Sequence, residues 1–394
     1  PPRSTLFPYT TLFRSGRDDA VRYTRIPLFS VWPRLLDGIV SSFSLWRSHE
    51  KFAGAISIPF RARRIIFYAS SFAEGARLRG YLRLTSVTPR SHVADIQISD
   101  GNGNLLIHFK GWEEICERVP PEYQQYILKP SEKFLTHELP LALLGNPSTP
   151  VAASVATDVP FRIFENNQEI WLKTLAYVLL SPAEREEWLE MQGATSRRVE
   201  WLFGRAAAKE SARRYLQKFH QARWTAADIP IWADDSGKPH PLGPWREHTA
   251  ANIDLSIAHT SKLIVAAVAA HARIGIDIEA VGRDLTEDFT KGVFTQTELE
   301  LAARTGEAPV AMLRFWCAKE AISKALGTGI RYSPKDLHIA AYDSGTGQIQ
   351  IELLGQWLEA FKNLKGRRHT VFSSVYAGHA FASCLLPNSL FESG

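Results

Sequence analysis

Two short segments, residues 274–279 and residues 315–324, place the strongest constraint on how this chain folds. The first reads Ile-Gly-Ile-Asp-Ile-Glu, and its apolar residues alternate with Gly275, Asp277 and Glu279, which predicts a buried strand. Alternate side chains of a strand share a face, so the two carboxylates lie side by side, about 7 Å apart along the backbone. Like charges this close are unfavourable unless a cation lies between them or one carboxylate is protonated.

The second segment, Phe-Trp-Cys-Ala-Lys-Glu-Ala-Ile-Ser-Lys, predicts a helix. Trp316, Glu320 and Lys324 are spaced by four residues, which puts them on one helix face. A third carboxylate then joins the pair on the strand, and three oxygen ligands without nearby Cys or His suit a hard cation such as Mg²⁺. From the residues alone, an alternative remains: the acids form a salt-bridge network with Lys319 and Lys324.

These two segments together resemble the signature of the 4′-phosphopantetheinyl transferases, and most closely the large, surfactin-synthetase type of that family. The resemblance implies an enzyme that uses Mg²⁺ and transfers the phosphopantetheine arm of coenzyme A to a serine of an apo acyl carrier protein or carrier domain. It implies that Asp277, Glu279 and Glu320 hold the metal and that Glu320 is also the catalytic base. It further implies that Lys324 stabilises or protonates the leaving bisphosphate and that Lys319 binds phosphate.

An internal repeat predicts two related α+β halves, residues 159–255 and 256–387. Ala-Lys-Glu at residues 208–210 recurs at residues 318–320, and in each half a capping-box sequence begins an earlier helix (Ser-Pro-Ala-Glu at 181–184 and Thr-Gln-Thr-Glu at 295–298). Chance similarity of short Lys-Glu helices is the alternative. The family resemblance adds that the halves form a pseudo-twofold pair with the site at their interface.

Further residues are candidates for binding coenzyme A. Arg205 and Lys209 are four residues apart, so they share a helix face that suits a phosphate, although a solvated basic face has the same pattern. Residues 256–260, Ser-Ile-Ala-His-Thr, resemble the family's Ser-x-Ser-His-Ser loop, with Ala258 where Ser is usual. The resemblance implies that His259 holds the 3′-phosphate and that Thr260 lies near the pyrophosphate.

Residues 17–138 predict a separate hotdog domain, in which a sheet wraps a central helix. A helical pattern begins at Pro33, and Asp-Gly-Asn-Gly at residues 100–103 predicts a hairpin turn. The expected strands are 55–60, 64–69, 77–87, 93–99 and 105–109.

This domain resembles the second half of a polyketide synthase dehydratase. The Pro-Arg-Leu-Leu-Asp stretch at residues 33–37 matches a family motif, which implies that Asp37 is a former catalytic acid. A helix-start acid favoured by the helix dipole is the alternative. The His-x-x-x-Gly-x-x-x-x-Pro motif of the first hotdog is absent, and dehydration needs both a base and an acid. We therefore predict a degenerate dehydratase site without activity in this chain.

Two segments are predicted to lie outside the folded domains. Residues 1–16 repeat Thr-Leu-Phe without a fold signal, which predicts a non-native leader or, alternatively, a disordered tail. Residues 139–158 are rich in Pro, Ala, Ser and Thr and predict a linker.

Composition indicates a cytoplasmic protein that binds neither membrane nor nucleic acid. The longest apolar run, residues 263–270, is too short to span a bilayer. The three cysteines are scattered, which fits a reducing compartment. The net charge is +5, but Lys and Arg are spread out, and coenzyme A and an acidic carrier are sufficient anionic partners. The competing function is a non-catalytic carrier-docking module.

Overall fold

The computed structural model describes residues 55–69, 77–88, 90–118, 121–157, 159, 164, 169–249, 252–260 and 263–391. The chain divides into two compact units, residues 1–124 and residues 125–394. The described residues of the first unit form an antiparallel sheet, and the second unit is of the α+β class that the sequence predicts for the chain as a whole. None of the helices within the described ranges has the length and apolar character that a membrane crossing needs.

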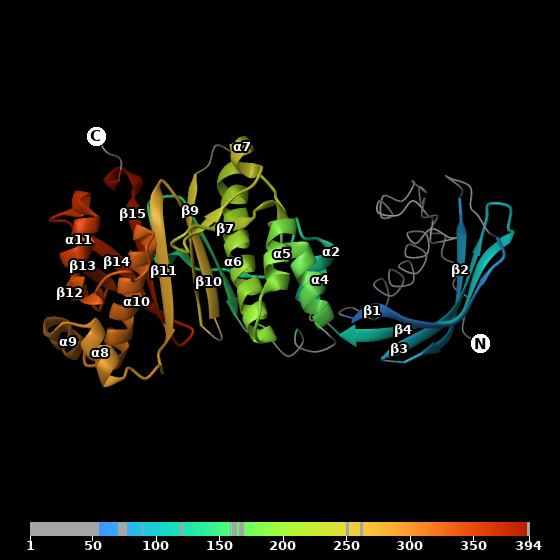
Figure 1. Ribbon diagram of the computed structural model, residues 1–394, viewed down its shortest axis with the longest axis horizontal. Coiled ribbons are helices and arrows are strands. Elements are labelled where there is room, and N and C mark those ends of the chain that lie inside the picture. Colours follow the sequence, from blue (N-terminus) through green and yellow to red (C-terminus); the bar gives the residue numbers. More distant parts are fainter. Residues whose placement is uncertain are drawn as a thin grey trace. The chain divides into compact units, whose positions relative to one another are not determined.

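The described part of the first unit is a four-stranded antiparallel sheet in the order β1-β4-β3-β2 (Figure 1). Its strands are β1 (Ala55–Phe67), β2 (Arg79–Val87), β3 (Ser91–Ser99) and β4 (Leu105–Arg118). The predicted turn joins β3 to β4, and Asp100 fixes it by accepting the N–H groups of Asn102 and Asn104. The two strands expected in residues 55–69 are one long strand, β1. The helix expected from Pro33, and with it Asp37, lies outside the described residues.

The second unit begins with a four-stranded sheet in the order β5-β6-β10-β9. Its strands are β5 (His137–Glu138), β6 (Val151–Thr157), β9 (Ile253–His259) and β10 (Leu263–Ala270). The associated helices are α4 (Ile170–Leu179), α5 (Pro182–Glu190) and α6 (Thr195–His220), and α6 packs on β6 and β10. Residues 139–158, predicted to be a linker, instead contain a short 3₁₀ helix and the buried strand β6, which pairs along its whole length with β10.

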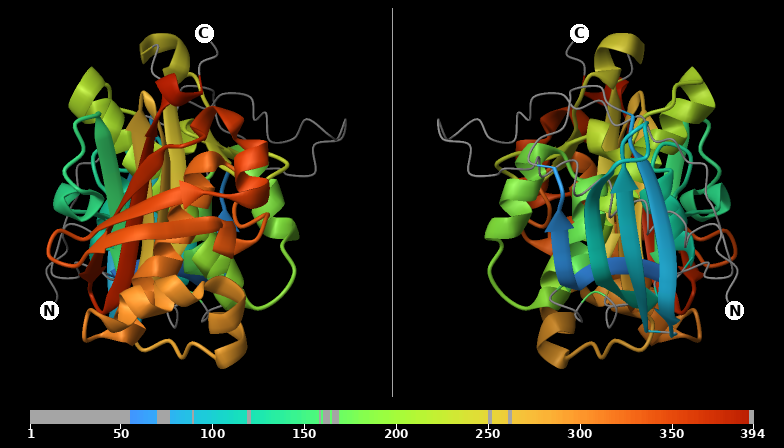
Figure 2. Two further views of the ribbon diagram at one scale, coloured as in Figure 1. Left: turned by 90° about the vertical axis from the view of Figure 1, so that its left-hand side faces the viewer. Right: turned by 90° about the vertical axis from the view of Figure 1, so that its right-hand side faces the viewer.

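A second, five-stranded sheet follows in the order β11-β15-β14-β13-β12. Its strands are β11 (Ala272–Ala280), β12 (Leu337–Asp343), β13 (Gln348–Leu353), β14 (Arg368–Tyr376) and β15 (His379–Pro387). The helices are α8 (Glu287–Val293), α9 (Gln296–Ala303), α10 (Ala308–Leu326) and α11 (Gly355–Ala360), and α10 packs on β11 and β15. In the left view of Figure 2 the orange and red strands of this sheet lie in front of the β5-β6-β10-β9 sheet and run at an angle to it.

Shorter elements complete the second unit. They are α2 (Pro121–Leu128), which spans the boundary between the units, the hairpin β7 (Ile231–Ala233) and β8 (Pro239–Pro241), and α7 (Trp245–Thr249).

The two sheets of the second unit meet at the neighbouring strands β9 and β11. The Asp254 carboxylate accepts the N–H of Ile274 at 2.7 Å, and the Ser256 hydroxyl accepts the N–H of Ile276 at 3.0 Å. Side chains of β9 therefore bridge to the backbone of β11. A single apolar cluster with members from β6, β10, β11 and β15 lies beneath both sheets. Since β10 pairs with β6 and β9 pairs with β10, the first half extends to His271 rather than ending near residue 255 as predicted.

Candidate active site

Strand β11 positions the two carboxylates of the signature. Asp277 is 8% exposed, and Glu279 follows two residues later and is half-buried. Gly275, two residues before Asp277, is where helix α10 touches the strand. A Cβ atom added there would lie 1.9 Å from the carbonyl oxygen of Ala321 and 2.5 Å from the backbone nitrogen of Ala325. The glycine of the Gly-Ile-Asp-Ile-Glu motif thus permits direct contact between β11 and α10.

Helix α10 brings the other half of the signature onto the same strand. The Lys324 Nζ atom donates to Asp277 Oδ1 at 2.7 Å and to the carbonyl of Ile276 at 3.2 Å. The indole N–H of Trp316 donates to Glu279 at 3.3 Å, and its ring packs edge-on against Phe289. The two segments singled out in the sequence therefore lie together in space, and Trp316 both packs against Phe289 and contacts Glu279.

The site raises the pKa values of two of its acids. Burial is the main cause for both Glu279 and Glu320, and the neighbouring charge of Asp277 adds to it. Burial also disfavours the Lys324 ammonium, but the charges of Asp277 and Glu320 outweigh that effect and raise the pKa of Lys324. This lysine is therefore protonated throughout the physiological pH range.

The carboxylates of Asp277, Glu279 and Glu320 differ in their hydrogen-bond and ion-pair partners. Glu279 pairs with Arg283, and one oxygen of Asp277 is taken by Lys324. The second oxygen, Asp277 Oδ2, is buried and accepts no N–H or O–H among the described residues, although the buried Cys317 thiol interacts with the Asp277 side chain. For the Glu320 carboxylate, no donor is found among the residues that the structure describes. Within these residues no cluster of three or more His, Cys, Asp and Glu side chains is arranged as a metal site.

Thr260, the residue after β9, lies at the Glu279 end of β11. The Thr260 hydroxyl is 3.1 Å from Nε2 of His379, and His379 pairs with Ala280 in the β11–β15 ladder. His259 is the last residue of β9, and its side chain is exposed. The candidate residues His259 and Thr260 are thus near the carboxylates rather than in a separate region.

Lys209 and Lys319, predicted to bind phosphate, have a different role. Both side chains are fully buried, and each ammonium group donates to one carboxylate and two backbone carbonyls. Lys209 bonds Glu184, Leu179 and Ala226, and Lys319 bonds Glu298, Val293 and Pro334. An ammonium group has three protons, so neither lysine retains a donor for a phosphate.

We call each of these pairs, Lys209–Glu184 and Lys319–Glu298, a latch, and the two latches match atom for atom. In both, the glutamate belongs to the capping box of the preceding helix, and its other oxygen accepts a backbone N–H beyond the lysine helix, at Ile231 and Ile339 respectively. The capping boxes and the Ala-Lys-Glu repeat are visible in the sequence, but the contact between them was not predicted. The signal was present, because both motifs recur in both halves in the same order.

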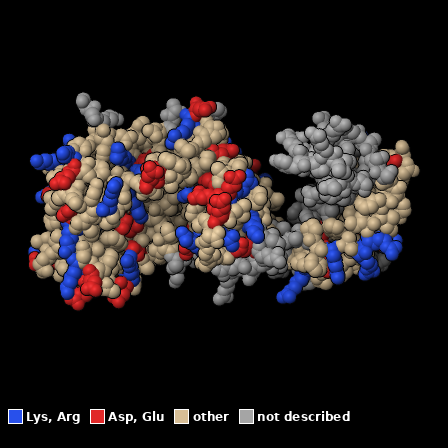
Figure 3. All heavy atoms as spheres, in the orientation of Figure 1, with Lys and Arg blue, Asp and Glu red and all other residues tan. Residues whose placement is uncertain are grey.

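Arg205 does not form a pair of cations with Lys209. Its guanidinium stacks on Trp201 at 4.4 Å from the ring centroid, and its Nε atom is buried without a partner. Burial lowers the pKa of Arg205, against the opposing charges of Glu184 and Glu187. On the described surface shown in Figure 3, cations and acids are interspersed over the second unit rather than gathered in a stripe.

Comparison with known proteins covers both units. Residues 273–378 match the family model described as the 4′-phosphopantetheinyl transferase superfamily. Residues 14–116 match the model described as the polyketide synthase dehydratase N-terminal domain, not the second half of a dehydratase that the sequence predicts.

Curated relatives match part of the chain. A holo-(acyl-carrier-protein) synthase from Fusobacterium nucleatum is 40% identical over 112 residues, which is 28% of this chain and 89% of the relative. One from Caldicellulosiruptor saccharolyticus is 36% identical over 96 residues, 23% of this chain and 76% of the relative. Among solved structures, the Bacillus anthracis holo-(acyl-carrier-protein) synthase in complex with CoA (3′,5′-ADP) is 24% identical over 31% of this chain and 95% of that chain, with a TM-score of 0.25.

Proposed function

The chain belongs to the 4′-phosphopantetheinyl transferase superfamily, and from this premise we propose how its second unit performs the transfer. It is a holo-(acyl-carrier-protein) synthase: it moves the phosphopantetheine arm of coenzyme A to a serine of an apo acyl carrier protein. The observation that carries the residue assignments is the convergence of β11 and α10, which puts Asp277, Lys324 and Glu320 in one place.

Glu320 is proposed as the base. A serine hydroxyl is a weak nucleophile until a base accepts its proton. The Glu320 carboxylate has no protein donor among the described residues, and burial raises its pKa towards the range in which a carboxylate is an effective base. As the proton moves to Glu320, the serine oxygen bonds to the phosphorus that bears the pantetheine arm. The bond from that phosphorus to the oxygen of the adenosine phosphate breaks, and adenosine 3′,5′-bisphosphate leaves.

Lys324 is proposed to stabilise the negative charge that the leaving bisphosphate gains. Its pKa is raised, so it is a full cation, and two of its three protons are taken by Asp277 and Ile276. One proton remains for a phosphate oxygen. Asp277 both orients this ammonium and keeps it charged.

The carboxylates fit a bound Mg²⁺. The buried Oδ2 of Asp277 accepts no N–H or O–H among the described residues, and the Glu279 side chain is on the same strand face two residues later. Mg²⁺ needs only one or two carboxylates because water and substrate phosphates complete its shell, so the absence of a preformed cluster among the described residues is compatible with binding. When bound, the ion would offset charge on the pyrophosphate. Asp277 and Glu279 would hold it, with Glu320 as a third ligand.

Coenzyme A is proposed to bind at the end of β9, at His259 and Thr260. His259 is exposed at the end of that strand, and Thr260 lies at the Glu279 end of β11 through its contact with His379. Their ring and hydroxyl donors suit the 3′-phosphate and the pyrophosphate. Arg205, with its unpartnered Nε atom, is a further candidate for a phosphate contact. Lys209 and Lys319 are not part of this set.

The relatives that match are holo-(acyl-carrier-protein) synthases and not of the surfactin-synthetase type to which the sequence was likened, but we propose that this transferase unit is itself built of two halves. The matched latches support a duplicated unit, since the glutamate, the lysine and the backbone acceptors correspond in both halves. The dehydratase-like first unit supports a role in polyketide synthesis, in which a polyketide carrier domain would be the natural partner. A docking module without activity is the alternative, and the intact Asp277, Glu320 and Lys324 argue against it.

Intact-mass spectrometry of the carrier tests the function. Purified protein is incubated with Mg²⁺, coenzyme A and an apo acyl carrier protein, and we expect the carrier to gain one phosphopantetheine arm. Asp277→Ala should lose the gain while remaining folded, and Asp343→Ala, which removes an exposed acid from the β12–β13 turn, should retain it. Full activity of Asp277→Ala would exclude the role of Asp277. No gain on any carrier by folded wild-type protein would favour the docking module.

A further inference from the structure

Glu210 and Glu320 occupy matching places in the two halves. Each glutamate directly follows its latch lysine, Lys209 in α6 and Lys319 in α10. Because the two latches make the same contacts, each fixes its helix to the preceding helix and to the following strand in the same way. The two glutamates therefore leave their helices at equivalent positions, and their surroundings are directly comparable.

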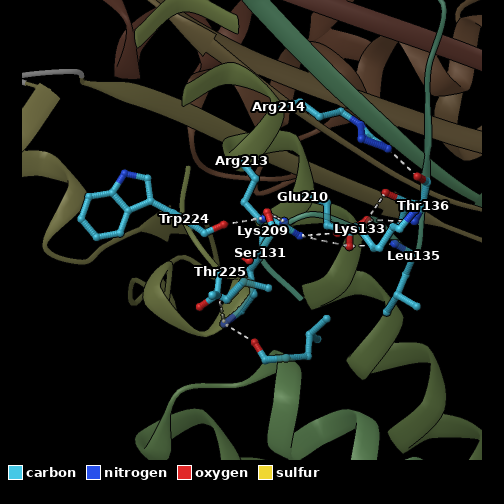
Figure 4. A network of polar contacts seen from close by, with 12 residues as sticks. Ser131, Lys133, Leu135, Thr136, Lys209, Glu210, Arg213, Arg214, Trp224 and Thr225 are labelled. Carbon is cyan, nitrogen blue, oxygen red and sulfur yellow. Dashed lines mark hydrogen bonds and ion pairs between the residues drawn. The ribbon is translucent and has the colours of Figure 1, made fainter. Parts of the chain in front are cut away.

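In the first half, residues of the same chain cover the Glu210 carboxylate and donate hydrogen bonds to it (Figure 4). The Thr136 hydroxyl donates to Glu210 Oε2 at 2.5 Å, and the Thr136 N–H donates to the same oxygen at 2.8 Å. The N–H of Leu135 lies 2.9 and 3.0 Å from the two carboxylate oxygens. Glu210 is thus buried completely but satisfied by one hydroxyl and two backbone N–H groups.

Two arginines hold the same segment, residues 131–136, in place. Arg213 donates to the carbonyls of Lys133 and Ser131 at 3.0 Å each, and Arg214 donates to the carbonyl of Thr136. Both guanidinium groups also stack on Phe134, at 4.4 and 4.1 Å from the ring centroid. The segment is therefore fixed along its length rather than touching Glu210 by chance.

In the second half the matching position is open. Glu320 is half-buried, and none of the described residues donates to its carboxylate. The proposed reaction requires a foreign hydroxyl at this place, that of the carrier serine. In the first half, a hydroxyl is already bound to the counterpart of the proposed base, because Thr136 donates to Glu210.

We propose that the carrier serine binds Glu320 as Thr136 binds Glu210, with its own backbone N–H as well as its hydroxyl on the carboxylate. This inference rests on the proposed function and adds how the partner is held. Glu320 would then anchor the carrier backbone at the reacting residue and not only accept a proton. A hydrogen bond from the serine N–H restricts the orientation of the serine and keeps its hydroxyl directed at the base. Holding reacting groups in the productive geometry accelerates a reaction.

The test is a carrier in which the N–H of the serine is removed and its hydroxyl is kept. An apo acyl carrier protein is assembled by chemical ligation with an ester in place of the amide on the N-terminal side of the serine. A second carrier has the ester two residues further on, as a matched control. Binding of each to the full chain is measured without coenzyme A, by fluorescence anisotropy of the labelled carrier.

We expect the serine ester to raise the Kd roughly 10- to 100-fold, which is typical for loss of a hydrogen bond to a charged group. The control ester should bind like the native carrier. With Glu320→Ala, the native and serine-ester carriers should bind equally, because the acceptor of that N–H is gone. Equal binding of both carriers to wild-type protein, or the same loss with the control ester, would overturn the inference.

A parallel mass measurement separates this inference from the proposed function. If the native carrier gains the arm but the ester makes no difference, the function stands and the N–H contact is wrong. If the native carrier neither binds nor gains the arm, the proposed function fails and the inference with it. Thr136→Val and Thr136→Ser check the internal copy: we expect only the valine variant to lower the urea midpoint of unfolding, with kcat/KM within about twofold of wild type.

Discussion

The two halves of the transferase unit share a scaffold and differ at one end of it. Both have a buried lysine latched to a capping-box glutamate, and in both a second glutamate follows the lysine. In the first half, residues 131–136 cover that glutamate, and the adjacent strand β6 offers only Val, Ala, Ser and Thr. In the second half, β11 supplies Asp277 and Glu279, and the glutamate stays open. The comparison indicates that the latch builds the scaffold and that the neighbouring strand decides whether it becomes a site.

Replacement of Gly275 by alanine should break the second half most severely. The added Cβ would overlap backbone atoms of Ala321 and Ala325, which cannot move without displacing α10. We expect a loss of more than about 4 kcal/mol in the free energy of unfolding, together with loss of transfer. Urea denaturation followed by tryptophan fluorescence measures the first, and intact-mass assay the second. A stable, active Gly275→Ala protein would contradict the close packing of β11 and α10.

The latches provide a matched pair of variants, Lys209→Met and Lys319→Met. Each removes the cation beside a buried glutamate, Glu184 or Glu298, and we expect each to cost about 3–5 kcal/mol of stability. The effects on catalysis should differ. Lys319→Met releases the helix that positions Glu320, so kcat of the folded protein should fall, whereas Lys209→Met should leave kcat nearly unchanged.

Stability from urea titration and kcat in stabilising osmolyte separate these outcomes, and Glu184→Gln and Glu298→Gln serve as partners in double-mutant cycles. Equal loss of kcat in both lysine variants would contradict the division between scaffold and site. Unchanged stability in both would mean that the latches are not structural, and phosphate binding by these lysines would return as an explanation.

The sequence predicts the residues of the site better than the strand and the buried contacts that hold them in place. The strand at residues 274–279 and the helix at 315–324 follow from local periodicity, and the i, i+4 spacing correctly brings Lys324 to the face that contacts Asp277. Strand β6 was missed because Ala and Ser have low strand propensity, and its strand conformation depends on pairing with β10, more than a hundred residues later. The latch partners are separated by 25 and 21 residues, and Thr136 and Glu210 by 74. Contacts of this kind arise from tertiary structure, which a pattern in one segment does not contain.

The pH dependence of transfer should distinguish the two glutamates. A base acts in its ionised form, so the rate falls about tenfold per pH unit below the pKa of that base. Burial raises the pKa of Glu320 above the ordinary value of 4.5 in the metal-free site, and a cation bound beside it would lower that pKa, so the acid limb of the kcat profile should move to lower pH as Mg²⁺ is raised. Burial raises the pKa of Glu210 as well, but Glu210 is enclosed, so Glu210→Gln should leave the limb in place. Circular dichroism at each pH controls for acid unfolding, and a limb that Glu210→Gln displaces, or that does not respond to Mg²⁺, would contradict the assignment of Glu320 as the base beside the metal.

Replacement of a second glycine, Gly204, should have the smallest effect on stability, and the effect should be opposite in sign to that at Gly275. Gly204 lies within α6 of the first half, and a Cβ there would meet only the Cγ2 atom of Ile257, at 4.0 Å. Glycine is disfavoured in a helix because it loses more backbone freedom than alanine, so Gly204→Ala should stabilise the unit by about 0.5–1 kcal/mol. Thermal unfolding should show a rise in Tm and transfer should be unchanged. A fall in Tm would mean that β9 packs against α6 more closely than a 4.0 Å contact with Ile257 allows, so that α6, like α10, has no room for a side chain at its glycine contact.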